Sequence, residues 1–127
     1  MVEPLELRVR ADKRVLVVVW EGQRAELAAE YLRVESPSAE VKGHGVGQAK
    51  LVSGKREVLI QTLEPVGSYA VKIGFSDGHA TGLYTWAYLR ELADEQAARW
   101  ACYLADLAAA GLSRDVVKPP VLRSALR

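Results

Sequence analysis

The chain has 127 residues, of which 50% are apolar and 26% are charged, the composition of a soluble globular domain. The formal net charge of +1 excludes the electrostatic footprint of a nucleic-acid-binding or membrane-surface protein. Cys102 is the only cysteine, which excludes an intrachain disulfide and favours a reducing, cytoplasmic compartment. The amino terminus lacks the pattern of a signal peptide, and the longest apolar run, residues 15–20, is too short to span a bilayer.

The first third of the chain predicts a β-hairpin that leads into a short helix. Residues 5–10 alternate apolar and polar, as in a half-buried strand, and residues 15–20 form a β-branched run typical of a strand buried on both faces. Residues 24–27 fit a short returning strand, and residues 28–34 predict a helix. The helix is expected to stop at Ser36-Pro37, because the residue before a proline disfavours the helical conformation.

A loop rich in glycine and lysine is expected over residues 38–56, and its glycine spacing does not match a dinucleotide-binding fingerprint. Residues 58–63 then alternate as a strand, and residues 65–68 turn the chain. Residues 71–75 predict the next strand. The Asp-Gly pair within residues 76–79 indicates a hairpin turn, since it tolerates positive φ, and residues 80–83 are expected to return as a strand.

Two helices are predicted after this hairpin. Thr85 is expected to cap the first, which begins at Trp86, and Asp94 to cap the second, which Gly111 ends. The second helix carries a broad apolar stripe that fits either the sheet or a partner, so self-association through Trp100 is one alternative. The stripe consists of Ala97, Trp100, Tyr103, Leu104, Leu107 and Ala108.

These elements predict one α+β domain over residues 1–110, mainly an antiparallel sheet of hairpins with two or three helices, and a surface tail over residues 111–127. The two halves echo each other, because each is a hairpin that leads into a helix. Cys102 is expected to be an exposed, unreactive thiol. No arrangement of nucleophile, acid or base is present, so we expect no enzyme activity.

Two long segments resemble a known family. Residues 31–45 read Tyr-Leu-Arg-Val-Glu-Ser-Pro-Ser-Ala-Glu-Val-Lys-Gly-His-Gly, and residues 64–89 contain Glu-Pro-Val-Gly-Ser-Tyr-Ala-Val, Phe-Ser-Asp-Gly-His and Gly-Leu-Tyr-Thr-Trp-Ala-Tyr-Leu. They are similar to the bacterial domain of unknown function 971, also called the γ-butyrobetaine hydroxylase-like N-terminal domain. The resemblance covers about residues 5–92.

The resemblance implies three contexts: standalone bacterial proteins without an established activity, a domain ahead of carnitine-pathway hydroxylases that use 2-oxoglutarate and Fe(II), and a domain on P-loop ATPases with iron–sulfur clusters. The chain has no room for an oxygenase fold, and its two histidines cannot supply the His-x-Asp/Glu…His ligand set. It also lacks a Walker A loop, so it resembles the standalone type.

The resemblance also implies a structural zinc site, which the hydroxylases build from three cysteines and a histidine. These positions fall at Ser36, Ser38 and Val41 and at His79 in this chain. Serine stays protonated near neutral pH and valine cannot ligate, so no complete tetrahedral site is expected. Instead, the two serines are expected to hydrogen-bond the loop backbone.

We therefore predict a non-catalytic interaction or accessory domain with a protein partner, no cofactor and no nucleic acid or membrane ligand, linked through its relatives to iron–sulfur or oxygenase systems. The alternative is a protein that binds zinc, another metal or a small ligand through His79 and His44. The predicted interaction surface joins the two resembling segments. Its residues are Ser36, Ser38, Glu40, Lys42, His44, Asp77 and His79.

Overall fold

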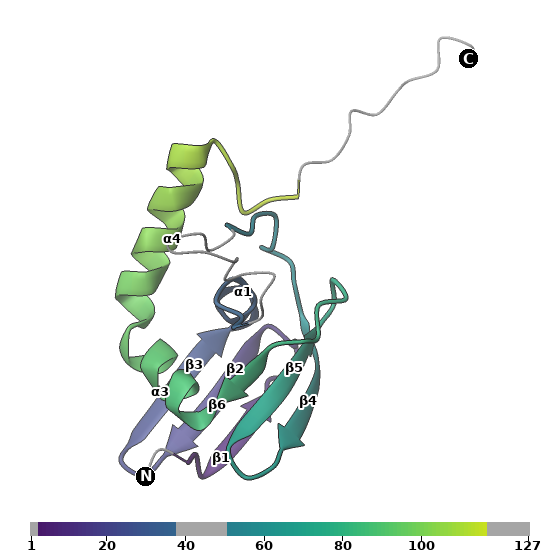
Figure 1. The fold of residues 1–127 in the computed structure, drawn as a ribbon, viewed down its shortest axis with the longest axis vertical. Helices are drawn as coiled ribbons and strands as arrows, with labels where there is room; N and C mark the ends of the chain where they lie inside the picture. The colour runs from purple at the N-terminus through teal and green to yellow at the C-terminus, as the bar shows by residue number, and fades with distance from the viewer. Residues whose placement is uncertain (1–2, 38–50, 117–127) are drawn as a thin grey trace, which may run out of the picture.

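The computed structural model describes residues 3–37 and 51–116, which fold as two similar halves (Figure 1). The first half consists of β1 (Glu6–Val9), β2 (Val15–Trp20), β3 (Gln23–Ala28) and α1 (Ala29–Val34). The second consists of β4 (Ile60–Val66), β5 (Ala70–Phe75), β6 (Leu83–Thr85) and α3 (Trp86–Asp94), with α4 (Gln96–Ala110) after it. Each half contains a three-stranded antiparallel sheet in sequence order. The predicted α+β class is therefore confirmed.

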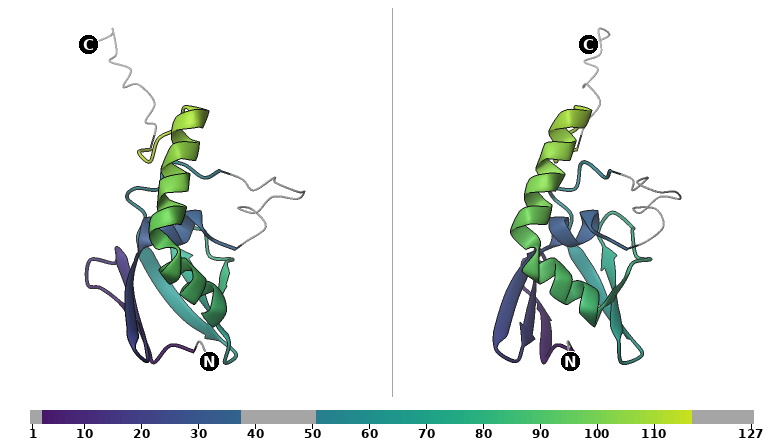
Figure 2. Two further views of the ribbon diagram at one scale, coloured as in Figure 1. Left: turned by 90° about the vertical axis from the view of Figure 1, so that its left-hand side faces the viewer. Right: turned by 60° about the vertical axis from the view of Figure 1, so that its left-hand side comes forward.

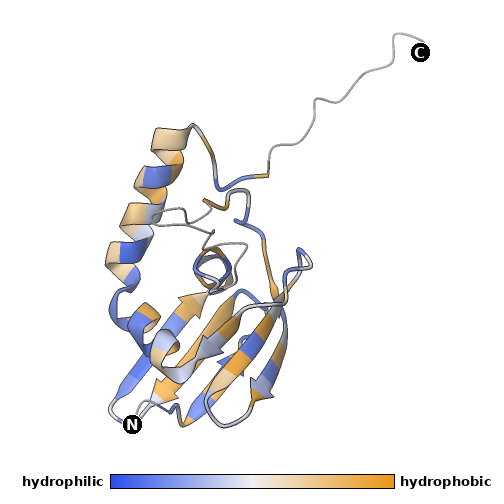
Figure 3. Ribbon diagram, viewed as in Figure 1, coloured by the Kyte–Doolittle hydropathy of each residue, from blue (hydrophilic) through white to orange (hydrophobic). Residues whose placement is uncertain are grey.

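The two sheets lie as separate layers, and one hydrophobic core joins them to α1 and α3 (Figure 2). Figure 3 shows the apolar residues concentrated along β2 and β5, the central strands of the two sheets. Leu16 and Val18 of β2 and Ile73 of β5 are fully shielded from solvent within this core. Burial of such β-branched and aliphatic side chains is the main favourable term in holding the sheets together.

Helix α1 lies at the centre of the molecule, and all six of its residues are buried (Figure 1). A helix this short is only marginally stable by itself, so tertiary contacts must hold it. The Tyr31 hydroxyl donates to the Leu92 carbonyl at 2.8 Å, and the Tyr84 hydroxyl donates to the Leu32 carbonyl at 2.5 Å. Helices and strands from the second half of the chain thus hold the last element of the first half in place.

The second sheet differs from the predicted strand positions in two places. The strand expected over residues 58–63 is β4, which extends through Pro65 to Val66; Pro65 is tolerated because β4 is an edge strand. The strand expected over residues 80–83 is wrong, because β6 begins at Leu83 and pairs with residues 70–72 of β5. The reason is tertiary: Gly82 lies directly against Ser36, two residues after α1 ends, and the pairing with β5 stops at Leu83.

The helix ends follow the sequence signals in three cases out of four, since α1 also ends at Val34, just before Ser36-Pro37, as predicted. Thr85 caps α3, accepting a hydrogen bond from the Tyr88 backbone N–H at 3.0 Å, and Gly111 ends α4 with a φ of 69°. The predicted cap at Asp94 is wrong, because Asp94 is the last residue of α3 and accepts a hydrogen bond from the Gln23 side chain. Within the described residues, no helix has the length and apolar character needed to cross a membrane.

The apolar stripe of α4 is only partly covered. Tyr103 and Leu107 are buried against Val34 and Val52, and the Tyr103 hydroxyl donates to the Val52 carbonyl at 2.7 Å. Trp100 is half-buried and packs edge-to-face on Tyr31, whereas the other members of the stripe are exposed: Ala97, Leu104 and Ala108. Cys102 is exposed, as predicted.

Candidate functional site

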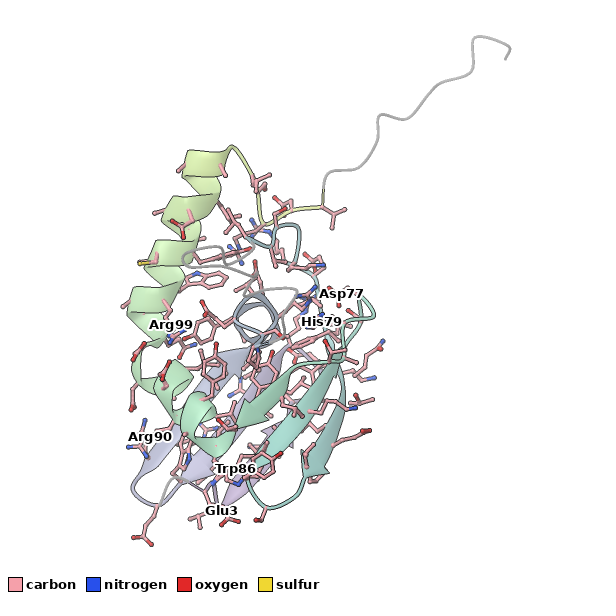
Figure 4. The ribbon with its side chains drawn as sticks, viewed as in Figure 1. Glu3, Asp77, His79, Trp86, Arg90 and Arg99 are labelled. Atoms are coloured by element: carbon pink, nitrogen blue, oxygen red, sulfur yellow. The ribbon has the colours of Figure 1, made fainter. Side chains whose placement is uncertain are left out.

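The two segments singled out in the sequence meet at a buried hydrogen bond. Ser36 Oγ lies 2.9 Å from His79 Nε2, although the residues are 43 positions apart. The exposed fraction is 1% for Ser36 and 8% for His79. Ser36 reaches this position because α1 ends at Val34 and the following proline prevents the helix from continuing. His79 arrives from the turn after β5 (Figure 4).

The turn over residues 76–79 is built by its Asp-Gly pair, as predicted. Gly78 has a φ of 91°, which an L side chain rarely adopts, and its N–H donates to the Phe75 carbonyl at 3.0 Å. Asp77 Oδ1 accepts a hydrogen bond from the His79 backbone N–H at 3.1 Å. The His79 carbonyl accepts one from the Phe75 N–H at 2.9 Å. These bonds direct the His79 ring inward, where it packs near Phe75.

Asp77 is the electrostatic centre of the site. Its Oδ2 accepts hydrogen bonds from Arg33 Nε at 2.8 Å and from Lys55 Nζ at 2.6 Å. The Arg33 side chain is only 4% exposed and that of Asp77 is 22% exposed. Burial raises the pKa of Asp77, but the hydrogen bonds from Lys55, His79 N–H and Arg33 outweigh it and hold the pKa at about 2. Asp77 is therefore ionised at neutral pH and joins α1, the segment around residue 55 and the turn.

The space above Ser36 is closed by Gly82. A Cβ at this position would overlap Ser36 Oγ and would lie within 3.2 Å of Pro37 Cδ and 3.3 Å of Tyr84 Cε1. Glycine is the residue that permits this approach of backbone to side chain. The Ser36–His79 bond is therefore sealed beneath the chain, with the fully buried Tyr84 close to Gly82.

A serine bonded to a histidine Nε2 has the chemistry of an activated nucleophile, but this pair lacks access. A substrate must reach the serine oxygen, and Ser36 is 1% exposed under Gly82. Asp77 uses one oxygen for the His79 backbone N–H and the other for two cations. The arrangement can hold two segments together, and it cannot present an oxygen to a substrate without opening.

The Ser36–His79 pair does not fit a zinc ion. His79 Nε2 is hydrogen-bonded to a hydroxyl that is a poor zinc ligand near neutral pH, so the pair offers a metal at most one good ligand. Over residues 3–37 and 51–116, no three His, Cys, Asp or Glu side chains gather closely enough to hold a metal. The remaining predicted residues lie outside the described residues: Ser38, Glu40, Val41, Lys42 and His44. A metal site on His79 with His44 therefore stays a prediction.

A second charged cluster, which the sequence analysis missed, holds the residue before Ser36. Arg99 of α4 donates to Glu35 at 2.8 Å and to Glu95 at 2.9 Å, and it also binds Glu91. The Tyr88 hydroxyl donates to the Glu35 carbonyl at 2.5 Å. Arg99 also lies over the Tyr88 ring. Side chains of α3 and α4 thus hold Glu35, the residue that lies between α1 and Ser36.

Arg33 and Lys55 were also missed as members of the site. The signal available for Arg33 was its place in a helix next to a predicted buried strand, since a buried arginine requires an acidic partner. Lys55 had no local signal. It was assigned to a solvated loop, and only the fold brings it to Asp77.

Comparisons with known proteins identify the family of this chain. Residues 7–90 match the family model "Gamma-butyrobetaine hydroxylase-like, N-terminal". Two solution NMR structures are each 43% identical to this chain, and each match covers 96% of this chain. The first has a TM-score of 0.79 and is covered over 96% of its own chain. The second has a TM-score of 0.76 and is covered over 92% of its own chain.

A crystal structure from Acidithiobacillus ferrooxidans ATCC 23270, of a DUF971-family protein with unknown function, is also 43% identical to the chain. It has a TM-score of 0.60 and covers 72% of this chain and 92% of its own. No curated protein matches. Since the family model spans most of the chain and the fold agrees, the protein belongs to the γ-butyrobetaine hydroxylase-like N-terminal domain family, DUF971.

Proposed function

We propose that this protein is a non-catalytic interaction domain of the cytoplasm, whose binding face is the turn over residues 76–79 and the chain that follows it. The observation that carries this proposal is the sealed Ser36–His79 bond with the Asp77 ion cluster beside it. In these contacts, buried polar groups hold one exposed turn in a single shape. Rigid, pre-shaped loops bind at a lower entropic cost than loops that must be ordered on binding.

The binding face therefore differs in detail from the predicted residue set. Ser36 and His79 are buried, so they support the binding face from beneath and do not themselves contact a partner. The residues available to a partner are the exposed positions around them: Ser76, Asp77, Gly78, Ala80 and Thr81. The contexts of the family make proteins of iron–sulfur or oxygenase systems the first partners to test.

The test is in-cell chemical cross-linking of the full chain followed by mass spectrometry, with one arginine placed in the face and one placed far from it. Thr81→Arg introduces a bulky cation beside the turn. Glu21→Arg introduces the same side chain in the β2–β3 turn, at the opposite end of the sheets (Figure 1). We expect a partner that is cross-linked by the wild type and by Glu21→Arg and is lost with Thr81→Arg. Equal loss in both variants, or loss in neither, would contradict the proposed face.

Metal analysis separates this proposal from the metal-binding alternative. Protein purified without a chelating column is measured by inductively coupled plasma mass spectrometry, together with His79→Ala. We expect no stoichiometric ion in either protein. A tightly held ion in the wild type that disappears in His79→Ala would replace the interaction proposal with a metal-binding function.

A further inference from the structure

Residues 112–116, which we call the C-terminal latch, follow α4 and bind the segment that precedes β4 (Figure 1). The Gly54 N–H donates to the Ser113 carbonyl at 2.9 Å. The Arg56 N–H donates to the Arg114 carbonyl at 3.0 Å. The segment before β4 has no helix or strand of its own, so its contacts with neighbouring segments must fix its backbone.

The latch is anchored in the molecule through one side chain. Arg114 donates two hydrogen bonds to Glu30, at 2.8 and 2.7 Å, and the Glu30 side chain is only 7% exposed. The Arg114 guanidinium also lies over the Trp100 ring, 5.2 Å from its centroid. A paired arginine–carboxylate contact fixes orientation as well as distance, and the aromatic face adds a further attraction. Arg114 therefore ties the latch to both α1 and α4.

Residues 54–59 form a bridge between the latch and the proposed binding face. Lys55 lies between the two residues whose N–H groups bind the latch, and its Nζ binds Asp77 Oδ2 at 2.6 Å. At the far end of the bridge, the Leu59 N–H donates to Ser76 Oγ at 2.9 Å. The Ser76 N–H donates to the Leu59 carbonyl, also at 2.9 Å. The same short segment thus bonds the latch on one side and the turn on the other.

We propose that the latch sets the rigidity of the turn over residues 76–79 through this bridge, and as a regulator of partner binding it rests on the function proposed above. With the latch closed, the backbone on both sides of Lys55 is fixed and the ammonium group is held at Asp77. With the latch open, the same contact must overcome the conformational entropy of a longer free segment. The turn then becomes looser and binds a partner more weakly, because binding must order it.

The latch has few contacts that keep it closed. All of its residues except Arg114 are exposed, and the ion pair of Asp115 with Arg56 is exposed too, so it contributes little. Segments with few buried contacts open locally while the rest of the protein stays folded. Since coupling between two sites is reciprocal, a partner that binds the ordered turn must also favour the closed latch.

Amide hydrogen exchange of the full chain, measured by NMR, tests the coupling without a partner. Arg114→Ala removes the anchor, and the control Arg8→Ala removes an arginine whose ion pair with Glu6 is exposed on β1. We expect the Ser76 and His79 amides of Arg114→Ala to exchange at least about 5-fold faster, relative to the amides of β2, and those of Arg8→Ala to be unchanged. Arg114→Lys keeps the charge but loses the paired geometry, and it replaces Arg114→Ala if that variant does not fold. Equal acceleration throughout the chain, or none at the turn, would overturn the proposal.

A double-mutant cycle measured by urea unfolding gives a second test. Asp77→Asn is introduced into the wild type, Arg114→Ala and Arg8→Ala. We expect its effect on the unfolding equilibrium constant to be at least about 3-fold smaller in Arg114→Ala than in the other two, because Lys55 is then no longer held at residue 77. An equal effect in all three proteins would overturn the proposal. Neither test involves a partner, so failure of the latch is distinguishable from failure of the binding face, which the Thr81→Arg cross-linking reports.

Discussion

Asp77→Asn removes one negative charge from the centre of the site and leaves the side-chain volume unchanged. The carboxylate accepts hydrogen bonds from two cations and one backbone N–H, which lower its pKa from 3.8 to about 2. This difference corresponds to roughly 2 kcal/mol at about 1.4 kcal/mol per pH unit, less the screening by water at the exposed part of the side chain. We therefore expect the variant to unfold with a free energy lower by about 1–2 kcal/mol at pH 7.

The pH dependence gives this prediction a sign that can be checked. Since the pKa of Asp77 is lower in the folded than in the unfolded chain, its stabilising effect is complete above about pH 4. The effect is lost as the pH falls through about 2. The difference between wild type and Asp77→Asn should therefore shrink as the pH is lowered from 5 toward 2.

Urea unfolding followed by tryptophan fluorescence measures both effects, with Asp115→Asn as the control. Asp115 also binds an arginine, Arg56, but its side chain is 64% exposed, so its removal should change stability little. The reasoning is refuted if Asp77→Asn and Asp115→Asn are equally stable at pH 7. It is also refuted if the deficit of Asp77→Asn is the same at pH 2 and pH 7.

Two further substitutions test the packing around the site. Gly82→Ala should lower the free energy of unfolding by about 2 kcal/mol, because the new Cβ overlaps Ser36 Oγ. In a double-mutant cycle measured by urea unfolding, adding Ser36→Ala should recover part of that loss. Strictly additive effects of the two substitutions would show that the overlap is relieved elsewhere. Glu30→Gln weakens the paired hydrogen bonds from Arg114, at 2.8 and 2.7 Å, by about 2 kcal/mol and should speed tryptic cleavage after Arg114. Unchanged cleavage would mean that the backbone bonds from Gly54 and Arg56 hold residues 113–114 by themselves.

Local signals were sufficient for much of the fold. The β-branched run of β2, the Asp-Gly turn, the Thr85 cap and the Gly111 stop each depend on neighbouring residues, and the structure shows all four. The repeated pattern of hairpin and helix also appears, as two three-stranded sheets that each lead into a helix. These features follow from backbone preferences and from side-chain alternation, which act over a few residues.

Errors arose where a distant contact overrode the local preference. The position of β6 was misplaced because Gly82 is held against Ser36, 46 positions earlier in the chain. The Asp94 cap was wrong because its carboxylate binds Gln23 and Arg90. Aspartate is a good capping residue in isolation, but that preference is worth only about 1 kcal/mol and yields to a tertiary contact.

The sequence by itself determined the class of fold, the family and the pairing of the two segments that carry Ser36 and His79. Only the tertiary structure decided what those segments do. It seals the serine and histidine beneath Gly82, gives Asp77 two cations from elsewhere in the chain, and leaves half of the α4 stripe uncovered. The physical reason is that burial and charge pairing depend on residues 22 to 46 positions apart, which local periodicity does not encode.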